Sequence, residues 1–365
     1  MRTRIRDTAV ALVAASTAVA LGACGSDGAG GTGGTGDGNG PKIGILLPDN
    51  TTARWETQDR PLLEKEIEKR CRDCTVEAAN AKADVAAQQQ QMDSMIANGA
   101  DALLLVAVDA RAMASAVRKA EEAGIPVIAY DRLADGPIAG HVSFDGEEVG
   151  RLQGNALLKA MGDEVPGAEI VMMNGDLSDP NAVLFKRGAL SVLQGKVKIG
   201  KAYDTLQWRP EAANQNMSAA IAALGGDSID GVYAANDGLA AGSISSLRAN
   251  QVRPLPPVTG QDAELGAVRR IVEGTQYMTV YKPFLPEATA GAEMAVAAAR
   301  DENLDRVADD EVTTRDGHRV PTVTLAPVPV TVNNVKDTLV KDGVYTVRQI
   351  CVPDLAAACR TAGLT

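Results

Sequence analysis

Pairs of hydrogen-bonding side chains follow several short apolar runs of this sequence. The pairs are Asp49-Asn50, Asp131-Arg132, Asn236-Asp237 and Gln261-Asp262, and one lysine, Lys282, follows a fifth run. Carboxylate and amide oxygens accept hydrogen bonds, whereas amide, guanidinium and ammonium groups donate them. A set that mixes donors with acceptors suits a ligand whose groups both donate and accept, as hydroxyl groups do. These residues therefore predict reversible capture of a polyhydroxylated molecule such as a sugar.

Two tryptophans can supply the apolar contacts that such a ligand also needs. The chain has only two Trp, six Tyr and three Phe residues, so the positions of Trp55 and Trp208 are informative. Trp55 opens the first predicted helix, and Trp208 precedes the helix that Pro210 and Glu211 start. The C–H faces of a sugar ring pack on flat aromatic rings. We expect both indole rings to lie at the ligand site.

Each of these residues also has a purely structural interpretation. Asp237 and Asp179 could serve as helix N-caps, a common role of aspartate. Trp208 could be a hydrophobic staple and Trp55 a core residue. Lys282 could be a solvated surface charge. A shared ligand site is favoured because all of these residues fall at the same end of the predicted strands.

The elements that must position these residues alternate along the chain. Strands are predicted at 43–47, 76–79, 103–108, 127–130 and 141–144, with helices at 54–70, 85–98 and 111–123. The pattern then repeats, with strands at 170–173, 197–202, 232–235, 258–260 and 278–281, helices at 185–193, 211–224, 239–249, 265–273 and 287–300, and an extended run at 323–332 before 335–341. Apolar strands that alternate with helices predict parallel sheets covered on both faces. The fold class is therefore α/β, with two doubly wound lobes whose ligand end lies beyond the carboxyl ends of the strands.

The first residues have the layout of a secretory signal peptide. Arginines at 2, 4 and 6 precede an almost uncharged run at 8–21, and Leu21-Gly22-Ala23-Cys24 follows. This ending is similar to the bacterial lipobox, which implies removal of residues 1–23 and a diacylglyceryl group on Cys24; an ordinary signal peptide with an incidental cysteine is the alternative. Residues 24–41 are rich in glycine, a composition typical of a flexible tether. We expect an extracytoplasmic protein that its N-terminal lipid anchors to the cell membrane.

Charge and composition bear on other classes of partner. The net charge is −11, from 36 basic and 47 acidic residues, which argues against a nucleic-acid partner. No second apolar stretch is long enough to cross a bilayer. The two histidines, His141 and His318, are far apart in the sequence, so no metal site is predicted. No cofactor is expected either.

Four further cysteines form two local pairs, Cys71 with Cys74 and Cys351 with Cys359. Disulfides persist in exported chains, so we interpret the pairs as two short-loop disulfides. Four cysteines allow three pairings, and the sequence leaves the other two open. Cys71-Arg72-Asp73-Cys74 could instead be a redox motif. However, this pair follows a predicted helix and so lacks the helix N-terminus that lowers the pKa of a thiol.

Several longer segments match a known family in order and spacing. They are Arg54-Trp55, Ala129-Tyr130-Asp131-Arg132, Ser143-Phe144-Asp145, Asn236-Asp237, Gly260-Gln261-Asp262, Thr279-Val280-Tyr281-Lys282-Pro283 and Asn333-Asn334-Val335-Lys336-Asp337. The segments resemble those of periplasmic sugar-binding proteins of ABC transporters, most closely the xylose-binding members. The resemblance runs from Lys42 to about Gly343, and the tail that carries Cys351 and Cys359 lies outside it. It implies a type I periplasmic-binding fold, with lobes of residues 42–142 plus 283–325 and 143–282 plus 326–365 joined by a three-segment hinge.

The resemblance also implies a ligand site and partners. The ligand contacts would be Arg54, Trp55, Asp131, Arg132, Asp179, Asn181, Trp208, Asn236, Asp262 and Lys282. In this similarity the two indole rings stack on the sugar, the three aspartates accept hydrogen bonds from its hydroxyls, and the arginines, Asn236 and Lys282 donate to its oxygens. The implied protein is a monomer without enzymatic activity that closes its lobes on a monosaccharide, foremost D-xylose, and delivers it to an ABC permease.

Other functions use the same fold or residues. A receptor for another pentose or hexose, or one that serves a membrane sensor, would need the same architecture. A glycosidase could use Asp131 and Asp262 as acid and base, although donors as numerous as acceptors favour binding. A transcription regulator with this sensor fold would need a DNA-reading helix pair at its start, where the predicted signal peptide stands.

Overall fold

The computed structural model describes residues 40–162 and 165–364. The predicted signal peptide, Cys24 and nearly all of the predicted tether lie outside the described residues, so lipid attachment stays a prediction. Within the described ranges, the helices are all too short or too polar to span a bilayer.

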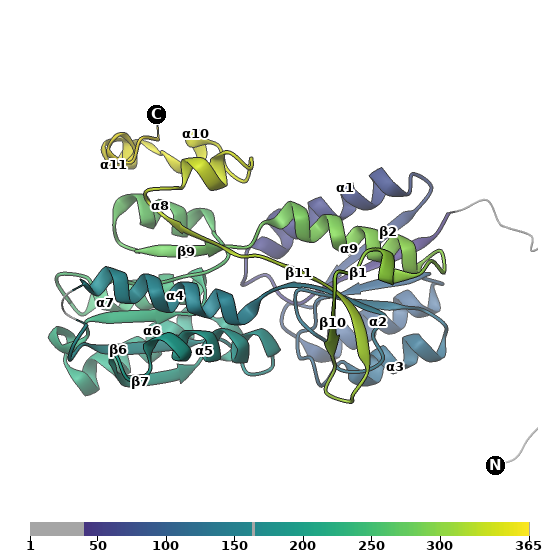
Figure 1. Cartoon of the computed structure of the whole chain (residues 1–365), viewed down its shortest axis with the longest axis horizontal. Helices are drawn as coiled ribbons and strands as arrows, with labels where there is room; N and C mark the ends of the chain where they lie inside the picture. The colour runs from purple at the N-terminus through teal and green to yellow at the C-terminus, as the bar shows by residue number, and fades with distance from the viewer. Residues whose placement is uncertain (1–39, 163–164, 365) are drawn as a thin grey trace, which may run out of the picture. The chain divides into compact units, whose positions relative to one another are not determined.

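A seven-stranded sheet forms the core of the N-terminal lobe (Figure 1). Its order is β10-β11-β5-β4-β3-β1-β2. The strands are β1 (Lys42–Leu47), β2 (Thr75–Asn80), β3 (Ala102–Leu105), β4 (Val127–Tyr130), β5 (Gly140–Phe144), β10 (Asp310–Thr313) and β11 (Arg319–Leu325). Neighbouring strands run parallel except β10, which pairs antiparallel with β11. The predicted parallel sheet is therefore present, and β10 is an addition that the sequence pattern did not indicate.

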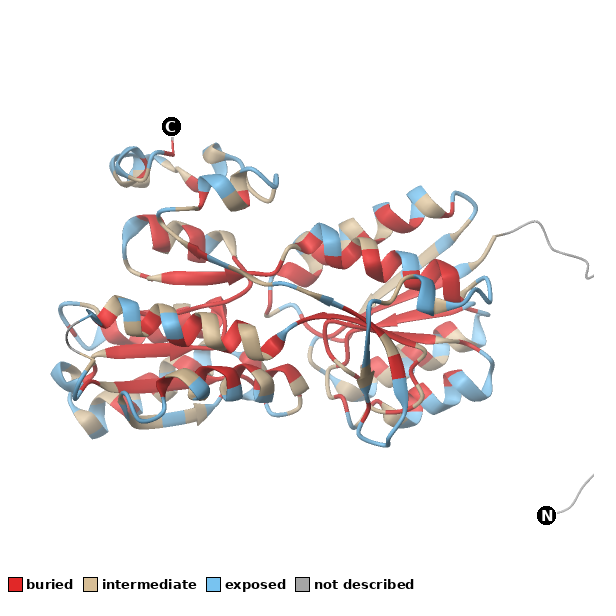
Figure 2. Ribbon diagram, in the orientation of Figure 1, coloured by how far each residue is buried: buried red, intermediate tan, exposed pale blue. Residues whose placement is uncertain are grey.

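Helices cover both faces of this sheet. They are α1 (Arg60–Arg70), α2 (Val85–Ala97), α3 (Ala114–Glu122) and α9 (Phe284–Ala298), and a π-type segment, η1 (Trp55–Asp59), precedes α1. Side chains of α1 and α9 share one apolar cluster with the sheet, and those of α2 and α3 share another on the opposite face. Because both faces are covered, β3 and β4 are buried along their whole length (Figure 2).

The C-terminal lobe holds two smaller groups of strands. They are β6 (Glu169–Asn174), β7 (Lys198–Asp204) and β8 (Gly231–Ala234), in the parallel order β7-β6-β8, and β9 (Met278–Tyr281) with β12 (Val328–Thr331), which run antiparallel. The strand predicted at 258–260 is wrong as a full strand: the segment makes only the single bridges Val232 to Val258 and Gln261 to Val280. Pro256 and Pro257 precede it and have no N–H to donate to a ladder.

The helices of this lobe are α4 (Gly146–Met161), α5 (Pro180–Leu193), α6 (Pro210–Leu224), α7 (Asp237–Ala249) and α8 (Leu265–Glu273). The sequence pattern did not indicate α4, because Gly150 and Gly154 lie on its buried side. A Cβ atom at Gly150 would lie 2.0 Å from the carbonyl oxygen of Phe185 in α5. These glycines therefore permit close packing of the two helices, at the cost of a weaker helical pattern.

Three short connections join the lobes, as the fold class requires. Asp145 links β5 to α4, Lys282 and Pro283 link β9 to α9, and Ala326 and Pro327 link β11 to β12. The predicted extended run at 323–332 is thus two strands, one in each lobe. The boundary expected after Val142 falls inside β5, which pairs along its length with β4 and β11.

Candidate ligand-binding site

The ten predicted site residues converge between the lobes. All ten are buried, with 2–6% of their surface exposed. One cavity is lined by nine of them, all except Arg54, and by three further residues: Thr52, Phe185 and Gln261. The arrangement follows from the topology, because Asp131, Asn236, Asp262 and Lys282 each come within two residues of the end of a strand or bridge segment whose carboxyl end faces this cavity.

Lys282 and Asp131 form the charged centre of the cavity wall. The Lys282 Nζ atom lies 2.9 Å from Asp131 Oδ2 and 3.2 Å from Asp262 Oδ1. Burial by itself would raise the pKa of the Asp131 carboxyl, but the charges of Lys282 and Arg54 hold that pKa well below its usual range. Asp131 is therefore ionised. Burial by itself would lower the pKa of the Lys282 ammonium, but the charges of Asp131 and Asp262 raise that pKa above its usual value.

Arg54 lies one layer behind the cavity, not in its lining. Its Nε and Nη2 atoms donate to the two oxygens of Asp59 over 2.7 and 2.6 Å, and Nη1 donates to Asp131 Oδ2 over 3.0 Å. Nη2 also pairs with Glu287, which lies 233 residues further along the chain. Protein carboxylates accept four hydrogen bonds from Arg54, which thereby helps to position Asp131. The predicted donation from Arg54 to the ligand stays a prediction.

Carboxyl groups outnumber the cations of this buried network, and Glu287 is one of them. Burial, together with the charges of Asp131 and Asp59, raises the pKa of Glu287 to about 8 and outweighs the Arg54 guanidinium. An unfolded glutamate has a pKa of about 4.3. Between these values the folded protein holds a proton that the unfolded chain has lost, so stability falls as the pH rises.

The raised pKa of Glu287 predicts that the stability of the fold depends on pH. We expect the midpoint of urea unfolding to be higher near pH 5.5 than near pH 8.5. Burial also raises the pKa of Asp179, Asp237 and Glu264, which contribute with the same sign. Glu287→Gln should therefore reduce the dependence, since a neutral amide removes the proton uptake of this group but can still accept a hydrogen bond from Arg54. A variant with an unchanged pH slope would show that another group is responsible.

Two contacts cross from one lobe to the other inside the site. Asn181 Nδ2 donates to the backbone oxygen and to Oδ1 of Asp131, each over 3.0 Å. Arg132 Nε lies 2.8 Å from Asp179 Oδ2. The cavity between these groups has a volume of about 20 Å³, roughly the space of one water molecule. In this closed arrangement the polar groups of the two lobes therefore contact each other directly.

The N-cap interpretation and the site interpretation coexist at two residues. The Asp179 side chain accepts from Asn181 N and so caps α5, while its other oxygen faces Arg132. Asn236, not Asp237, caps α7 through a 2.9 Å bond from Leu239 N. Asp237 lies outside the cavity lining and accepts hydrogen bonds from Gln276, Thr279 and the Glu264 backbone.

The two indole rings line the same cavity from opposite lobes. Trp55 has the guanidinium carbons of Arg54 and Arg132 at 4.6 and 5.6 Å from its ring. Trp208 packs edge-on against Phe185, with ring centroids 6.4 Å apart. A Cβ atom at Gly175 would lie 2.0 Å from the Trp208 ring, so the absence of a side chain at this position lets the indole pack against the backbone. Each tryptophan thus belongs both to the core of its own lobe and to the shared cavity.

Thr52, Phe185 and Gln261 were not predicted as ligand contacts. A signal existed for two of them: Gln261 belongs to the Gly-Gln-Asp segment, and Phe185 lies one helical turn after Asn181 on α5. Gln261 Oε1 is buried without a hydrogen-bond partner, as are both indole N–H groups, and the only partner of Asp262 Oδ1 within 3.5 Å is the Lys282 ammonium. Buried polar groups are normally satisfied, so these atoms are candidates for ligand contacts.

The cysteine pairs and the histidines lie away from this cavity. The structure joins Cys71 to Cys74 in the N-terminal lobe and Cys351 to Cys359 in the tail. His141 is buried in β5, where burial lowers its pKa to about 4, and His318 is exposed. Among the described residues, no group of His, Cys, Asp and Glu side chains is arranged to hold a metal ion.

The sequence matches the model of a known protein family. Residues 43–303 match the model of the periplasmic binding protein domain. The chain belongs to the periplasmic binding protein family. This membership confirms the resemblance seen in the sequence and, with the solved structures below, the predicted two-lobed α/β fold class.

Two curated relatives of this periplasmic binding protein span most of both chains. It is 36% identical to the D-xylose-binding periplasmic protein of Escherichia coli K12 over 311 residues, which cover 83% of this chain and 91% of the relative. It is 32% identical to a multiple sugar-binding periplasmic protein of Azospirillum brasilense, with coverage of 85% and 91%.

Among solved structures, an ABC transporter solute-binding protein of Clostridium phytofermentans with bound β-D-glucose is similar at a TM-score of 0.76. It is 28% identical, and the match covers 85% of this periplasmic binding protein and 99% of that chain. A solute-binding protein of Chloroflexus aurantiacus in complex with D-glucose has the same TM-score at 27% identity, with coverage of 84% and 97%.

Proposed function

We propose that this periplasmic binding protein captures a monosaccharide, foremost D-xylose, by closing its lobes, and delivers it to an ABC permease in the membrane. The observation that carries the proposal is a single buried cavity that both lobes line with carboxyl and amide acceptors, charged donors and two indole rings. The xylose-binding relative supports the choice of sugar. No bond of the sugar is broken, since the site serves equilibrium binding.

The proposed roles follow from charge and geometry. Asp131, Asp262 and Gln261 accept hydrogen bonds from sugar hydroxyls, and Lys282 and Arg132 donate to sugar oxygens. Asn181, Asn236 and Asp179 complete the polar wall from the C-terminal lobe. Trp55 and Trp208 hold the two faces of the ring.

Sugar binding and closure of the lobes are coupled. In the closed arrangement Asn181 contacts Asp131 directly, so a sugar must enter while the lobes are apart and then take the place of this contact. The sugar favours the closed form because only there can both lobes bind it. Residues 1–23 would direct export, and a lipid on Cys24 would keep the receptor near the permease.

A thermal-shift panel over pentoses and hexoses tests the proposal. A ligand at 100 times its dissociation constant adds about 2.7 kcal/mol of stability. At about 2–4 °C per kcal/mol, D-xylose should raise the melting temperature by about 5–10 °C. The proposal fails if no sugar of the panel raises it.

A hexose is the second candidate, because D-glucose is bound in two solved structures that share this fold. A hexopyranose carries one hydroxymethyl group more than a pentopyranose. Isothermal titration calorimetry with D-xylose and D-glucose, which differ in that group alone, distinguishes the two candidates: the true ligand binds at least tenfold more tightly.

A further inference from the structure

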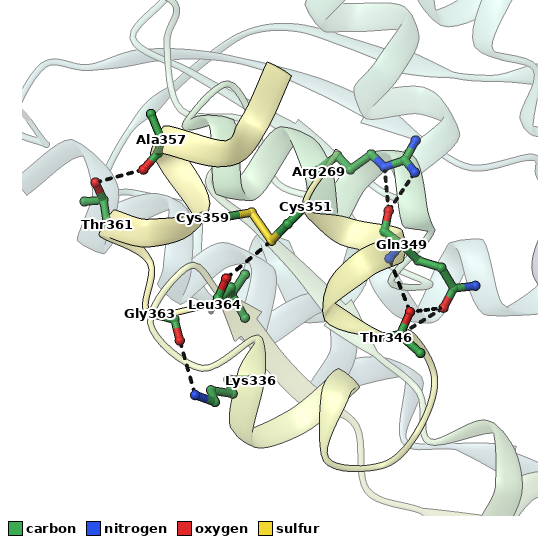
Figure 3. The surroundings of a disulfide bond; sticks show 10 residues. All are labelled: Arg269, Lys336, Thr346, Gln349, Cys351, Ala357, Cys359, Thr361, Gly363 and Leu364. Carbon is green, nitrogen blue, oxygen red and sulfur yellow. Dashed lines mark hydrogen bonds between the residues drawn. A yellow bond between two sulfur atoms is a disulfide. The ribbon is translucent and has the colours of Figure 1, made fainter. Parts of the chain in front are cut away.

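The C-terminal tail, residues 344–364, lies beyond the part of the chain that the family model matches. It folds into α10 (Val347–Ile350), the short turn η7 (Pro353–Leu355) and α11 (Ala356–Thr361). The disulfide between Cys351 and Cys359 joins the end of α10 to α11 (Figure 3). The tail is therefore a closed unit of its own.

The tail packs on α8 and does not extend into solvent. Ile350, Cys359 and Leu364 are at most 2% exposed, and they share one apolar cluster with Val268 and Ile271 of α8. Such burial removes apolar surface from water and holds the two elements together.

Two sets of hydrogen bonds fasten the tail to the C-terminal lobe. Arg269 of α8 donates from Nε and Nη2 to the backbone oxygen of Gln349 over 3.1 and 2.6 Å. Lys336 Nζ donates to the Gly363 oxygen over 3.3 Å (Figure 3). Both ends of the tail are thus attached, one to α8 and one to the segment before the tail.

The same cluster contains the immediate neighbours of two site residues. Ala263 follows Asp262, and Tyr281 precedes Lys282; both neighbours are buried in the cluster that the tail completes. Phe284 belongs to it as well, and its ring lies 5.2 Å from the guanidinium carbon of Arg54. The cluster therefore joins residues of the tail to the sequence neighbours of Asp262 and Lys282.

The backbone at Asp262 needs external support. Asp262 and Ala263 have φ angles of 89° and 49°, in the left-handed region that non-glycine residues rarely adopt. Such conformations persist only when the surrounding structure imposes them. Two hydrogen bonds contribute, from Asp262 N to the Val280 oxygen and from Ala263 N to Thr279 Oγ1. The packing of Ala263 in the cluster supplies the rest.

We infer that the disulfide-closed tail is a positioning element for sugar binding: it holds Asp262 and Lys282 in the geometry that the ligand requires. This inference rests on the proposed function. Without the disulfide, α10 and α11 separate more easily, the cluster loosens, and the strained Asp262 backbone relaxes. Sugar affinity then falls although both lobes stay folded.

The chain offers a matched control. Cys351→Ser/Cys359→Ser removes the tail disulfide, and Cys71→Ser/Cys74→Ser removes the other one, which lies between α1 and the start of β2, at the end of the sheet opposite the cavity. By calorimetry with D-xylose, the tail variant should bind about tenfold more weakly, whereas the control should bind as the unaltered protein does. Arg269→Ala, which removes the contacts to Gln349, is a milder second variant and should give a smaller loss in the same direction.

A double-mutant cycle separates positioning from general loosening. Combined with Asp262→Asn, the tail variant should show clear non-additivity in affinity, because both changes act on the same group. Combined with Asp179→Asn, at the start of α5 and outside the apolar cluster of the tail, its effect should be additive.

Three results would overturn the inference. They are unchanged affinity in both tail variants, equal loss in the Cys71/Cys74 control, or additivity with Asp262→Asn. If the unaltered protein binds none of the sugars, the proposed function fails and the inference fails with it, an outcome distinct from the other three.

Discussion

Asp131→Asn should lower the affinity for D-xylose by about 100-fold with little loss of fold. The ionised carboxylate of Asp131 would accept from sugar hydroxyls while Lys282 and Arg54 hold it in place. A hydrogen bond to a charged group contributes about 1.5–3 kcal/mol, and 2.7 kcal/mol is about 100-fold in affinity. Asparagine is the least disruptive replacement, since the φ angle of 60° at this position is one that it tolerates.

The comparison for this variant is Asp84→Asn. Asp84 caps α2 outside the cavity, and asparagine caps a helix equally well, so this variant removes one negative charge and nothing else of consequence. Calorimetry should give the affinity of the unaltered protein for Asp84→Asn. An Asp131→Asn protein that binds D-xylose normally would remove Asp131 from the site.

Arg54→Met should be the most destabilising single change, with a loss of about 3–5 kcal/mol of unfolding free energy. Methionine preserves much of the side-chain volume and the packing on Trp55 and Phe284. It leaves the fully buried Asp59 carboxylate with only the Tyr130 hydroxyl as a side-chain partner. An uncompensated buried charge is far more costly than the loss of a surface ion pair.

Urea unfolding of two companion variants checks this mechanism. Arg60→Met removes an arginine whose ion pairs with Glu56 and Glu64 are exposed to solvent, and it should cost at most about 1 kcal/mol. Asp59→Asn added to Arg54→Met removes the unpaired charge and should recover part of the loss. If Arg54→Met and Arg60→Met are equally stable, the buried network does not stabilise the fold.

The sequence predicted the architecture well because strands buried on both faces are continuous apolar runs. β3, β4 and β8 are such runs, and the polar residues that follow them are brought together by topology alone. Helix α4 was missed because Gly150 and Gly154 replace apolar residues on its buried face. The segment at 258–260 was assigned as a strand because its apolar character is real, although prolines limit its pairing.

The depth of each residue in the site was harder to predict. Arg54 is expected from the sequence to touch the ligand, and the structure adds a partner, Glu287, which is 233 residues away in sequence and which no local pattern indicates. Likewise the contact of Asn181 with Asp131 exists only because two lobes close on each other. Sequence spacing specifies which strand end carries a residue, but packing between distant segments determines which atoms remain free for a ligand.

The three connections between the lobes have a kinetic consequence. They are one or two residues long, and two contain a proline, whose φ angle is fixed. Such connections allow rotation about a pivot but little sliding. Lys282 is part of one connection, so its ammonium group moves little as the lobes rotate. A sugar in the open form could therefore bind this cation before closure, and the groups on the moving lobe would engage in a later, unimolecular step.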